Sequence, residues 1–350
     1  MTVILDIRVL AGPNPDVAGP AVRLSVAAAW DTHEQTCDIV VQEAVAVGLG
    51  LSGDDLVVRP TDEGYVVAWP VSDRGLARAH LEAVRAAIDQ APRPEFSLGA
   101  PQPFELLDPA VPCLAVSGTN GKTTTTRLIA HCARTAGMST AWSSTDGVFR
   151  DGELVEAGDF SGPAGARRVL AEPGVAFAVL ETARGGLLLR GMSVRRVDVA
   201  VVTNVAADHL GSHGINTVEQ LAMVKATVVR VVGAHGWAVL NADDPLVRHM
   251  AQQTSARAWY FGLETDVVGE RYTTLREGRV VVMGDLQEDL GAVADMPITI
   301  GGHARFNVAN VLAAASGALA AGIPAQHVRE ALRTFRPDRR LSSGRFNCWA

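Results

Sequence analysis

The chain has 350 residues, of which 48% are apolar and 5% aromatic, and its formal net charge is −7. This length predicts two or three domains, the negative charge disfavours nucleic-acid binding, and no apolar run is long enough to span a membrane. Four scattered cysteines without a C-x-x-C pair indicate reduced thiols and a cytoplasmic protein.

Residues 1–90 are predicted to form a small α/β module. The opening segment MTVILDIRVLAG has no basic residue before its apolar stretch, so it indicates a strand and not a signal peptide. Six prolines between positions 92 and 112 then predict a linker over residues 91–112. The apolar pattern predicts strands at 3–10, 21–30 and 64–71 and helices at 37–50 and 75–91.

Residues 113–335 are predicted to form a larger α/β domain around a doubly wound, mostly parallel sheet. Its short strands are apolar almost throughout, which is typical of parallel strands covered on both faces, and helical segments alternate with them. Four of the strands end in polar sequence, and ligands of such sheets bind beyond the carboxyl ends of the strands. The predicted strands lie at 112–118, 177–183, 198–204, 236–244 and 257–262.

The first polar segment, SGTNGKT, follows a strand and opens a helix. Glycines let the backbone approach a phosphate closely, and Lys122 and the Thr123 hydroxyl would then contact the phosphates and Mg²⁺. The general phosphate-loop pattern has a glycine where this chain has Val116, so an ordinary glycine-rich turn is the alternative. Gly118, Gly121, Lys122 and Thr123 together favour phosphate binding.

Two further polar segments contain metal-ligand candidates. VLETARGG places Glu181 at the end of a buried strand, where a carboxylate is costly unless it is paired, with Arg184 for example, or binds Mg²⁺. In TNVAADHLGSHG, His209 and His213 have the i, i+4 spacing of a zinc helix. The glycines beside these histidines disfavour a helix, so zinc binding is the weaker interpretation.

Lys122 and Lys225 are the two lysines among 31 basic residues, and the other 29 are arginines. A general surface charge is therefore expected as arginine in this chain. Lysine is needed where the structure requires a slim point donor or an amine that can be modified. The lysine in the helical segment TVEQLAMVKATVVRVV thus indicates a specific role, with a solvated surface residue as the alternative.

These segments resemble the Mur ligase family over residues 113–347. The likeness is stronger to the Mur-ligase-like half of cyanophycin synthetases, and the first module, with VLAGPN near its start, is similar to a shortened N-terminal domain of those enzymes. Their ATP-grasp domain has no counterpart between the two parts here. The matching segments are SGTNGKTTTTRLIAH, SSTDGVFRDG, GDFSGPAGARRVL, AVLETARGGLLLRG, VVTNVAADHLGSHGI, VKATVV, AVLNADDPLV, HARFNVANVLAA and GRFN.

The resemblance implies an ADP-forming ligase, in which ATP phosphorylates a carboxylate and an amine then displaces the acyl phosphate to give an amide. It implies ATP and Mg²⁺ as cofactors, a small-molecule carboxylate and an amine such as an amino acid or peptide as partners, and neither nucleic acid nor membrane. The implied catalytic residues are Lys122, Lys225, which many members carbamylate, and Arg345, an interdomain arginine that reaches the phosphates. The other implied site residues are Gly118, Thr119, Asn120, Gly121, Thr123, Thr124 and Asn307 for the nucleotide, Thr123, Glu181 and His209 for metal, and Thr145, Asp146 and Asp159 for the acceptor.

A physical argument supports a modified Lys225. An ammonium about 5 Å from Mg²⁺ would be repelled by roughly 6 kcal/mol at an effective dielectric near 20. A carbamate carries a negative charge and can bind the ion instead. Lys225 is therefore expected either to point away from the metal or to be carbamylated.

Members of the family continue beyond GRFN into a third domain that binds the incoming amine, whereas this sequence has three further residues. Residues 336–350 are therefore interpreted as a linker stub to a C-terminal domain. The chain is expected to bind Mg-ATP but to ligate slowly unless a second copy, as in a homo-oligomer, or a separate chain completes the site. The alternatives are a P-loop kinase or ATPase without ligation, and a non-catalytic nucleotide-binding subunit that needs a partner chain.

Overall fold

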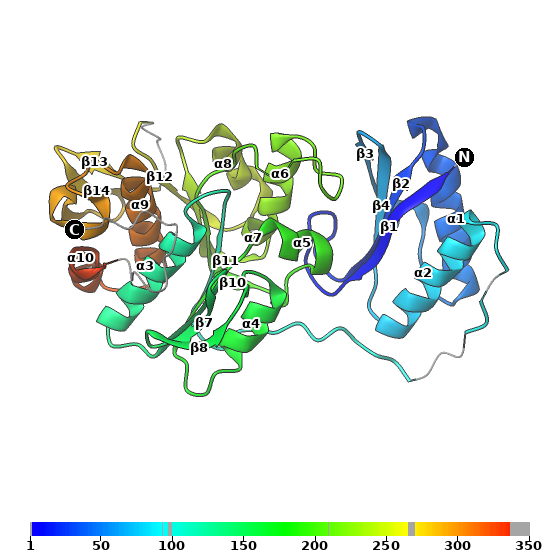
Figure 1. Ribbon diagram of the computed structural model, residues 1–350, viewed down its shortest axis with the longest axis horizontal. Helices are drawn as coiled ribbons and strands as arrows, with labels where there is room; N and C mark the ends of the chain where they lie inside the picture. Colours follow the sequence, from blue (N-terminus) through cyan, green and yellow to red (C-terminus); the bar gives the residue numbers. More distant parts are fainter. Residues whose placement is uncertain (1, 93, 97–99, 209, 265–269, 337–350) are drawn as a thin grey trace. The chain divides into compact units, whose positions relative to one another are not determined.

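The computed structural model describes residues 2–92, 94–96, 100–208, 210–264 and 270–336. It divides into two compact units, and each is described by itself (Figure 1). The predicted domain boundaries near residues 90, 112 and 335 stay a prediction. Two segments from the middle of the chain belong to the same unit as the N-terminal residues. The first unit contains the described residues of Met1–Leu107, Arg184–Arg195 and Ala207–Thr227, and the second those of Asp108–Ala183, Arg196–Ala206 and Val228–Ala350.

The first unit is built on a four-stranded antiparallel sheet. Its elements are β1 (Val3–Leu10), β2 (Ala21–Ala27), η1 (Trp30–Thr32), α1 (His33–Ala46), η2 (Gly53–Asp55), β3 (Val57–Thr61), β4 (Gly64–Pro70), α2 (Arg74–Ile88), α5 (Arg184–Arg190) and α6 (Val218–Lys225). The strand order is β1-β2-β4-β3. Both α1 and α2 lie on one face of the sheet (Figure 1), where Val40 and Val84 join Leu24 and Trp69 in one apolar core.

Most of the elements expected for this unit are present. The first strand has the predicted bounds, and α1 begins four residues before its predicted start, at His33. The strand β3 is not among the predicted elements, since Pro60 in its segment VVRPT disfavours a strand. Proline is tolerated there because β3 is an edge strand of the sheet.

The second unit is built on an 11-stranded sheet with helices on both faces. Its strands are β5 (Cys113–Ser117), β6 (Thr140–Ser144), β7 (Gly147–Arg150), β8 (Glu153–Ala157), β9 (Phe177–Glu181), β10 (Val197–Val202), β11 (Val232–Asn241), β12 (Arg257–Phe261), β13 (Arg271–Arg276), β14 (Arg279–Gly284) and β15 (Glu288–Ala292). Its helices are α3 (Lys122–Thr135), α4 (Pro163–Leu170), α8 (Pro245–His249), η3 (Met250–Gln253), η4 (Val293–Asp295), η5 (Pro297–Thr299), α9 (Arg305–Ala320) and α10 (Ala325–Thr334), and α7 (Thr227–Arg230) begins at the last residue of the first unit.

The predicted fold class is confirmed in this unit. The strand order is β15-β14-β13-β12-β11-β10-β5-β9-β6-β7-β8, and the strands from β13 to β6 run parallel. The five predicted strands correspond to β5, β9, β10, β11 and β12. The antiparallel hairpins at the two edges are not among the predicted elements. Edge strands such as β8 lack a continuous apolar run, and β8 is exposed along its whole length.

The chain changes direction across the sheet at β5. From β5 it crosses through α3 to β6, returns through α4 to β9 beside β5, and then passes to β10 on the other side of β5. Right-handed crossovers in opposite directions place α3 and α4 on opposite faces, as Figure 1 shows. A ligand crevice is expected at the carboxyl end of such a strand, and the loop at 118–121 begins there.

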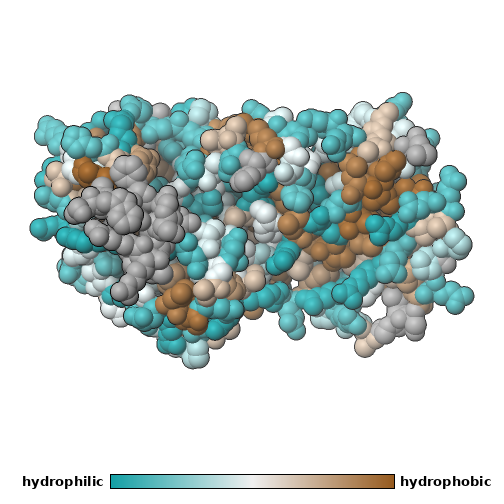
Figure 2. All heavy atoms as spheres, viewed as in Figure 1, coloured by the Kyte–Doolittle hydropathy of each residue, from teal (hydrophilic) through white to brown (hydrophobic). Residues whose placement is uncertain are grey.

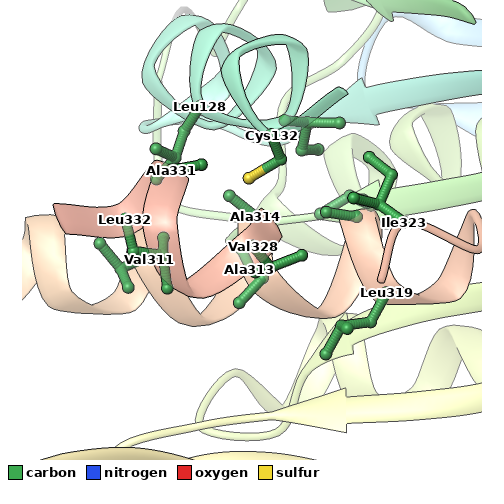
Figure 3. Packing of buried hydrophobic residues seen from close by; sticks show 14 of the residues in the cluster. Leu128, Cys132, Val311, Ala313, Ala314, Leu319, Ile323, Val328, Ala331 and Leu332 are labelled. Carbon is green, nitrogen blue, oxygen red and sulfur yellow. The ribbon is translucent and has the colours of Figure 1, made fainter. Parts of the chain in front are cut away.

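Helices α3, α9 and α10 pack together on one face of this sheet. Figure 3 shows Leu128 and Cys132 of α3 facing the small residue Ala314 of α9, with Val328 and Leu332 of α10 beside them. Twelve of the 16 residues of α9 are buried, and its run of alanines lets the neighbouring helices approach closely. This packing fixes the position of α3, whose first residue follows the glycine-rich loop.

The described cysteines are consistent with the expected reduced thiols. Cys37, Cys113 and Cys132 are free, and the last two are fully buried. Burial raises the pKa of the Cys132 thiol to about 12 and also raises the pKa of Cys113, next to Asp198. Both side chains therefore act as small apolar core residues. Cys348 lies outside the described residues.

The face of the protein shown in Figure 2 is mostly hydrophilic, with separate apolar patches. In the described part of the first unit, the exposed large apolar side chains are those of Val3, Leu5, Trp30, Val45, Val57, Leu210 and Met223. Within the described part of the chain, every helix is too short or too polar to traverse a lipid bilayer.

Shortening Leu128 should destabilise the second unit. This side chain is fully buried between α3 and α10, and Leu→Ala substitutions at such sites cost about 2–5 kcal/mol. Leu154→Ala is the matched control, because Leu154 is 44% exposed on β8 and should change stability by only about 0.5 kcal/mol. Urea unfolding of both variants measures the difference, and equal midpoints would show that the helix packing is wrongly described.

Candidate active site

The loop between β5 and α3 requires glycine at two positions. Gly118 and Gly121 have φ angles of +148° and +86°, where residues with a side chain are strained. A Cβ added to Gly118 would lie 1.9 Å from Oγ1 of Thr203, and one added to Gly121 would lie 2.1 Å from Oδ1 of Asn310. Backbone conformation and close neighbours therefore both exclude side chains, and the backbone of the loop stays accessible.

Lys122 is the first residue of α3 and projects over this loop. Its ammonium Nζ donates to the carbonyl oxygen of Thr119 at 2.9 Å. The first backbone N–H groups of a helix have no partner inside the helix, and they carry a partial positive charge. The ammonium and the start of α3 thus make the mouth of the loop electropositive, which is the environment that a phosphate prefers.

The Thr123 hydroxyl and the Glu181 carboxylate form a buried pair. Oγ1 of Thr123 donates to Oε2 of Glu181 at 2.8 Å, and Oγ1 of Thr145 lies 3.4 Å from the same hydroxyl. Thr123 is 6% exposed and Glu181 only 1%. A carboxylate buried to this extent needs strong compensation, and hydroxyl and carboxylate oxygens are the ligands that Mg²⁺ prefers.

The segment after β10 holds the glycine-rich loop in place. The side-chain Oδ1 of Asn204 accepts from the backbone N–H of Asn120 at 2.9 Å, and its Nδ2 donates to the carbonyl of Asn120 at 3.0 Å. The Thr203 hydroxyl donates to the same carbonyl at 2.6 Å, and the N–H of Thr119 donates to the carbonyl of Asn204 at 2.8 Å. Asn204 and Thr203 therefore provide hydrogen-bond partners for the N–H groups of Thr119 and Asn120 and for the carbonyl of Asn120.

The end of β11 supports this segment from behind. Nδ2 of Asn241 donates to the carbonyl of Thr203 at 2.7 Å, and Oδ2 of Asp244 accepts from the N–H of Val205 at 2.6 Å. Asp244 also caps the start of α8 through its other oxygen. The polar segments that follow β10 and β11 thus brace the loop, a role that their sequence pattern alone does not distinguish from ligand binding.

The start of α9 forms the other wall of the cleft. Asn307 is 7% exposed, and its Nδ2 donates to the carbonyl of Ile298 at 2.9 Å, while its Oδ1 accepts from Nδ2 of Asn310 at 3.3 Å. Phe306 beside them is 53% exposed. Asn310 is not among the predicted site residues. Its i, i+3 spacing from Asn307 places both side chains on one face of α9. The cleft has a volume of about 440 Å³ and is lined by Thr119, Asn120, Gly121, Lys122, Thr123, Thr124, Thr145, Glu181, Phe306, Asn307 and Asn310.

Two of the expected acceptor residues, Asp146 and Asp159, are not among the residues that line the cleft. Oδ2 of Asp146, next to Thr145, accepts from Nη2 of Arg127 at 2.9 Å. Asp159 lies on an exposed loop, where its Oδ1 accepts from the N–H and the hydroxyl of Ser161. The structure thus brings Thr145 to the Thr123–Glu181 pair, whereas the carboxylate of Asp159 supports its own turn.

Three further expected site residues are not among those described as lining the cleft of the second unit. Lys225 is the last residue of α6 in the first unit and is 3% exposed, so it is not a solvated surface lysine. His209 and Arg345 lie outside the described residues. Within the described ranges, no cluster of three or more His, Cys, Asp or Glu side chains has the arrangement of a metal site.

The family model of the Mur ligase middle domain matches residues 116–318, more than half of the chain. The chain belongs to the Mur ligase family. The matched region includes the glycine-rich loop, Glu181, the bracing segments and the start of α9. The resemblance seen in the sequence motifs is therefore confirmed.

Curated members of this family share substantial identity with the chain. The cyanophycin synthetase of Crocosphaera subtropica is 38% identical over 330 residues, which cover 91% of this chain and 38% of that enzyme. A UDP-N-acetylmuramoyl-L-alanyl-D-glutamate–2,6-diaminopimelate ligase of Thermosynechococcus vestitus is 33% identical over 229 residues, covering 63% of this chain and 44% of that protein. The chain thus spans less than two fifths of the length of the cyanophycin synthetase that it matches.

A solved Mur ligase structure has the same fold. The structure of a UDP-N-acetylmuramoyl-L-alanyl-D-glutamate–2,6-diaminopimelate ligase matches with a TM-score of 0.53 and 21% identity, covering 75% of this chain and 50% of that one. At this identity the likeness concerns the fold, which agrees with the parallel sheet and helices of the second unit.

A substitution at Gly121 should separate backbone strain from steric exclusion. Gly121→Ala places its Cβ against Asn310, whereas Gly137, with a similar φ of +78°, has open space around its missing Cβ. Both alanine variants should lose roughly 1–2 kcal/mol of stability from the left-handed backbone. Only Gly121→Ala should also weaken nucleotide binding, measured by titration calorimetry, and Gly121→Ala/Asn310→Ala should restore part of it. Equal nucleotide affinities for the Gly121 and Gly137 variants would contradict this description of the loop.

Proposed function

We propose that this chain carries the nucleotide site of an ATP-dependent, ADP-forming ligase that joins an amine to a carboxylate through an acyl phosphate. The observation that carries the proposal is the Thr123–Glu181 pair at the carboxyl end of the sheet. Thr123 follows Lys122 at the start of α3, directly after the glycine-rich loop, and Glu181 ends β9, the strand beside β5 where the chain changes direction. Such a loop suits the phosphates of a nucleotide. The membership in a family of ligases then favours amide formation over simple phosphoryl transfer.

The residues of the loop would act mainly by positioning. Backbone N–H groups of 121–124 and the Lys122 ammonium would hold the β- and γ-phosphates and offset the charge that develops during transfer, with Thr119 and Asn120 shaping the loop. The γ-phosphoryl group passes to a carboxylate oxygen, which leaves ADP and an acyl phosphate. An amine nitrogen then attacks the acyl carbon, the C–O bond to phosphate breaks, and the nitrogen loses a proton.

The residues present fit an Mg²⁺ ion. The Thr123 hydroxyl and the buried Glu181 carboxylate, 2.8 Å apart, would hold the ion, with His209 as a further proposed ligand. When bound, Mg²⁺ offsets the negative charge of the phosphate oxygens. Thr145, 3.4 Å from the Thr123 hydroxyl, would then face the acceptor carboxylate, and Asp146 and Asp159 are kept as acceptor-side residues in the proposal.

The start of α9 would contact the nucleotide base. Asn307 and the half-exposed ring of Phe306 line the cleft on this side, and a ring and an amide provide stacking and hydrogen bonding for a flat heterocycle. Arg345 is proposed to reach the phosphates from the segment that follows.

Lys225 is proposed to be carbamylated. Its burial disfavours an ammonium. Reaction of the neutral amine with CO₂ forms an N–C bond and releases a proton, which gives a carbamate able to bind Mg²⁺. Lys122 would then act as a slim cationic donor and Lys225 as an amine that can be modified, and arginine can fill neither role.

The proposed substrates are a small-molecule carboxylate and an amine such as an amino acid or a short peptide. A reaction that consumes ATP also favours a cytoplasmic location. The deciding experiment measures ADP release and amide formation by the purified chain over a panel of acids and amines, alone and with a C-terminal domain supplied on a separate chain. Amine-dependent ADP release supports the ligase. Release independent of amine indicates a kinase or ATPase, and nucleotide binding without turnover under any of these conditions indicates a non-catalytic subunit.

Removing the Lys122 ammonium should weaken Mg-ATP binding. Hydrogen bonds to charged groups contribute about 1.5–3 kcal/mol, so Lys122→Ala should lose roughly tenfold to hundredfold in affinity. Lys122→Arg should fail as well, because the guanidinium is wider than the ammonium. Arg85→Ala, which removes an exposed positive charge from α2 in the first unit, is the control and should keep the wild-type affinity by calorimetry. Wild-type affinity in the Lys122→Arg variant would show that the phosphate-loop assignment is wrong.

The modification of Lys225 can be tested without activity. In ¹³C-bicarbonate, the wild-type protein should show a carbamate carbon signal by NMR, which Lys225→Met should lack and Lys122→Ala should keep. The methionine variant retains the volume of the buried side chain, so its fold should survive. Short carboxylic acids should partly restore its Mg²⁺ affinity by occupying the place of the carbamate. The absence of any carbamate signal in the wild type, with unchanged Mg²⁺ affinity in Lys225→Met, would refute the proposal.

A further inference from the structure

The first unit contains a second cleft, of about 290 Å³, which we call the arginine cleft. It opens beside the four-stranded sheet, and the turn at 211–215 forms its other wall. It combines charges of both signs with neutral polar groups. Its polar lining includes Asp6, Arg8, Arg23, Ser25, His213 and Asn216.

Arg23 is the central group of this cleft. Its side chain is 2% exposed, and its Nε donates to Oδ2 of Asp16 at 3.2 Å. Nη1 lies 3.9 Å from Oδ2 of Asp6, and Nη2 is buried without a hydrogen-bond acceptor in the described part of the chain. A buried donor without an acceptor is costly, and a charged donor more so.

Arg23 shares its carboxylate partners with two other arginines. Arg59 donates from its Nε to the other oxygen of Asp16 at 2.7 Å, so two guanidinium groups share one buried carboxylate. Arg8 forms its own pair with Asp6. Three arginines therefore share two aspartates in this network of ion pairs, while Glu63, which also lines the cleft, is exposed. Burial lowers the pKa of Arg23, Asp16 opposes this, and the neighbouring Arg59 lowers it further.

A strained turn presents His213 to the cleft. His213 and Gly214 have φ angles of +59° and +71°, and the N–H of Ile215 donates to the carbonyl of Ser212 at 3.3 Å, as in a type I′ turn. A left-handed histidine is uncommon and is often found at functional sites. The missing Cβ of Gly214 would lie 4.0 Å from Nη2 of Arg23. The glycine thus leaves room directly in front of the donor that lacks an acceptor.

We propose that the arginine cleft binds the carboxylate group of a small molecule, with Nη2 of Arg23 as its principal donor. One carboxylate oxygen supplies the negatively charged acceptor that the buried Nη2 of Arg23 lacks among the described residues. A phosphate dianion fits less well, because Asp6 and the exposed Glu63 also line the cleft and would repel the second charge. None of the residues that line this cleft lines the cleft at the glycine-rich loop, and the proposal does not depend on the proposed ligase function.

His213 adds to the recognition of such a group. Burial and the nearby arginines, Arg8 and Arg184, lower its pKa, and Asp6 opposes this. The imidazole is therefore neutral at pH 7 and can donate one hydrogen bond. A bound carboxylate would raise the pKa of His213 again, because it stabilises the protonated ring.

Ligand-observed NMR with the full chain tests the proposal. Acetate and L-aspartate are the probes, and inorganic phosphate, added with the glycine-rich loop saturated by ADP, is the comparison ligand. We expect saturable binding of both carboxylates. Arg23→Met should raise the dissociation constant at least about tenfold, as the loss of a charge-assisted hydrogen bond implies.

Matched variants distinguish recognition from folding. Arg59→Met removes a positive charge beside the same Asp16 but no group that lines the cleft, so it should weaken binding clearly less than Arg23→Met does. Arg23→Lys keeps a positive charge beside Asp16 but loses Nη2, so it should bind carboxylates as poorly as Arg23→Met does. If the methionine variant does not fold, the lysine variant tests the role of Nη2 in its place. His213→Asn, which tolerates the left-handed turn, should weaken binding severalfold.

Three results would overturn the proposal. They are the absence of saturable carboxylate binding by the wild type, an unchanged affinity in Arg23→Lys, and tighter binding of phosphate than of acetate. Because none of these measurements involves ATP turnover, a failure here leaves the proposed ligase function untouched, and a failure of the ligase function leaves this site untouched.

Discussion

The second unit depends on the hydrogen bonds between Asn204 and the backbone of Asn120. A loop with glycines at 118 and 121 has few side-chain contacts of its own, so its shape needs support from a neighbouring segment. Asn204 satisfies both the N–H and the carbonyl of Asn120, and Thr203 adds a second bond to that carbonyl. The loop can therefore keep its outward-facing N–H groups available for a phosphate without losing its conformation.

The packing of α3 against α9 and α10 fixes the positions of the residues that line the cleft. Helix α3 starts at Lys122 and is held by α9 and α10 through a core of small apolar residues (Figure 3). The same α9 places Asn310 against Gly121 and Asn307 at the rim. A shift of α9 would therefore move the base side of the cleft and the loop together, which links the stability of the core to the geometry of the site.

Buried charge has different consequences in the two units. Glu181 is buried beside a hydroxyl in a position that suits a hard cation, whereas Arg23 is buried beside a carboxylate that it must share with Arg59. In each case a ligand of opposite charge would stabilise the buried group. Ligand binding at these two places can therefore offset the unfavourable free energy of burying the charges of Glu181 and Arg23.

The sequence by itself determined the parallel strands of the second unit, the glycine-rich loop and the family, because continuous apolar runs and the spacing of Gly118, Gly121 and Lys122 are local patterns. The edge hairpins escaped prediction, since their strands are short and partly exposed. Only the tertiary structure decided that Asn204 braces the loop, that Asn310 restricts Gly121, and that Arg23 faces a turn far away in the chain. These relations depend on which segments meet across the sheets, and no local pattern of residues encodes them.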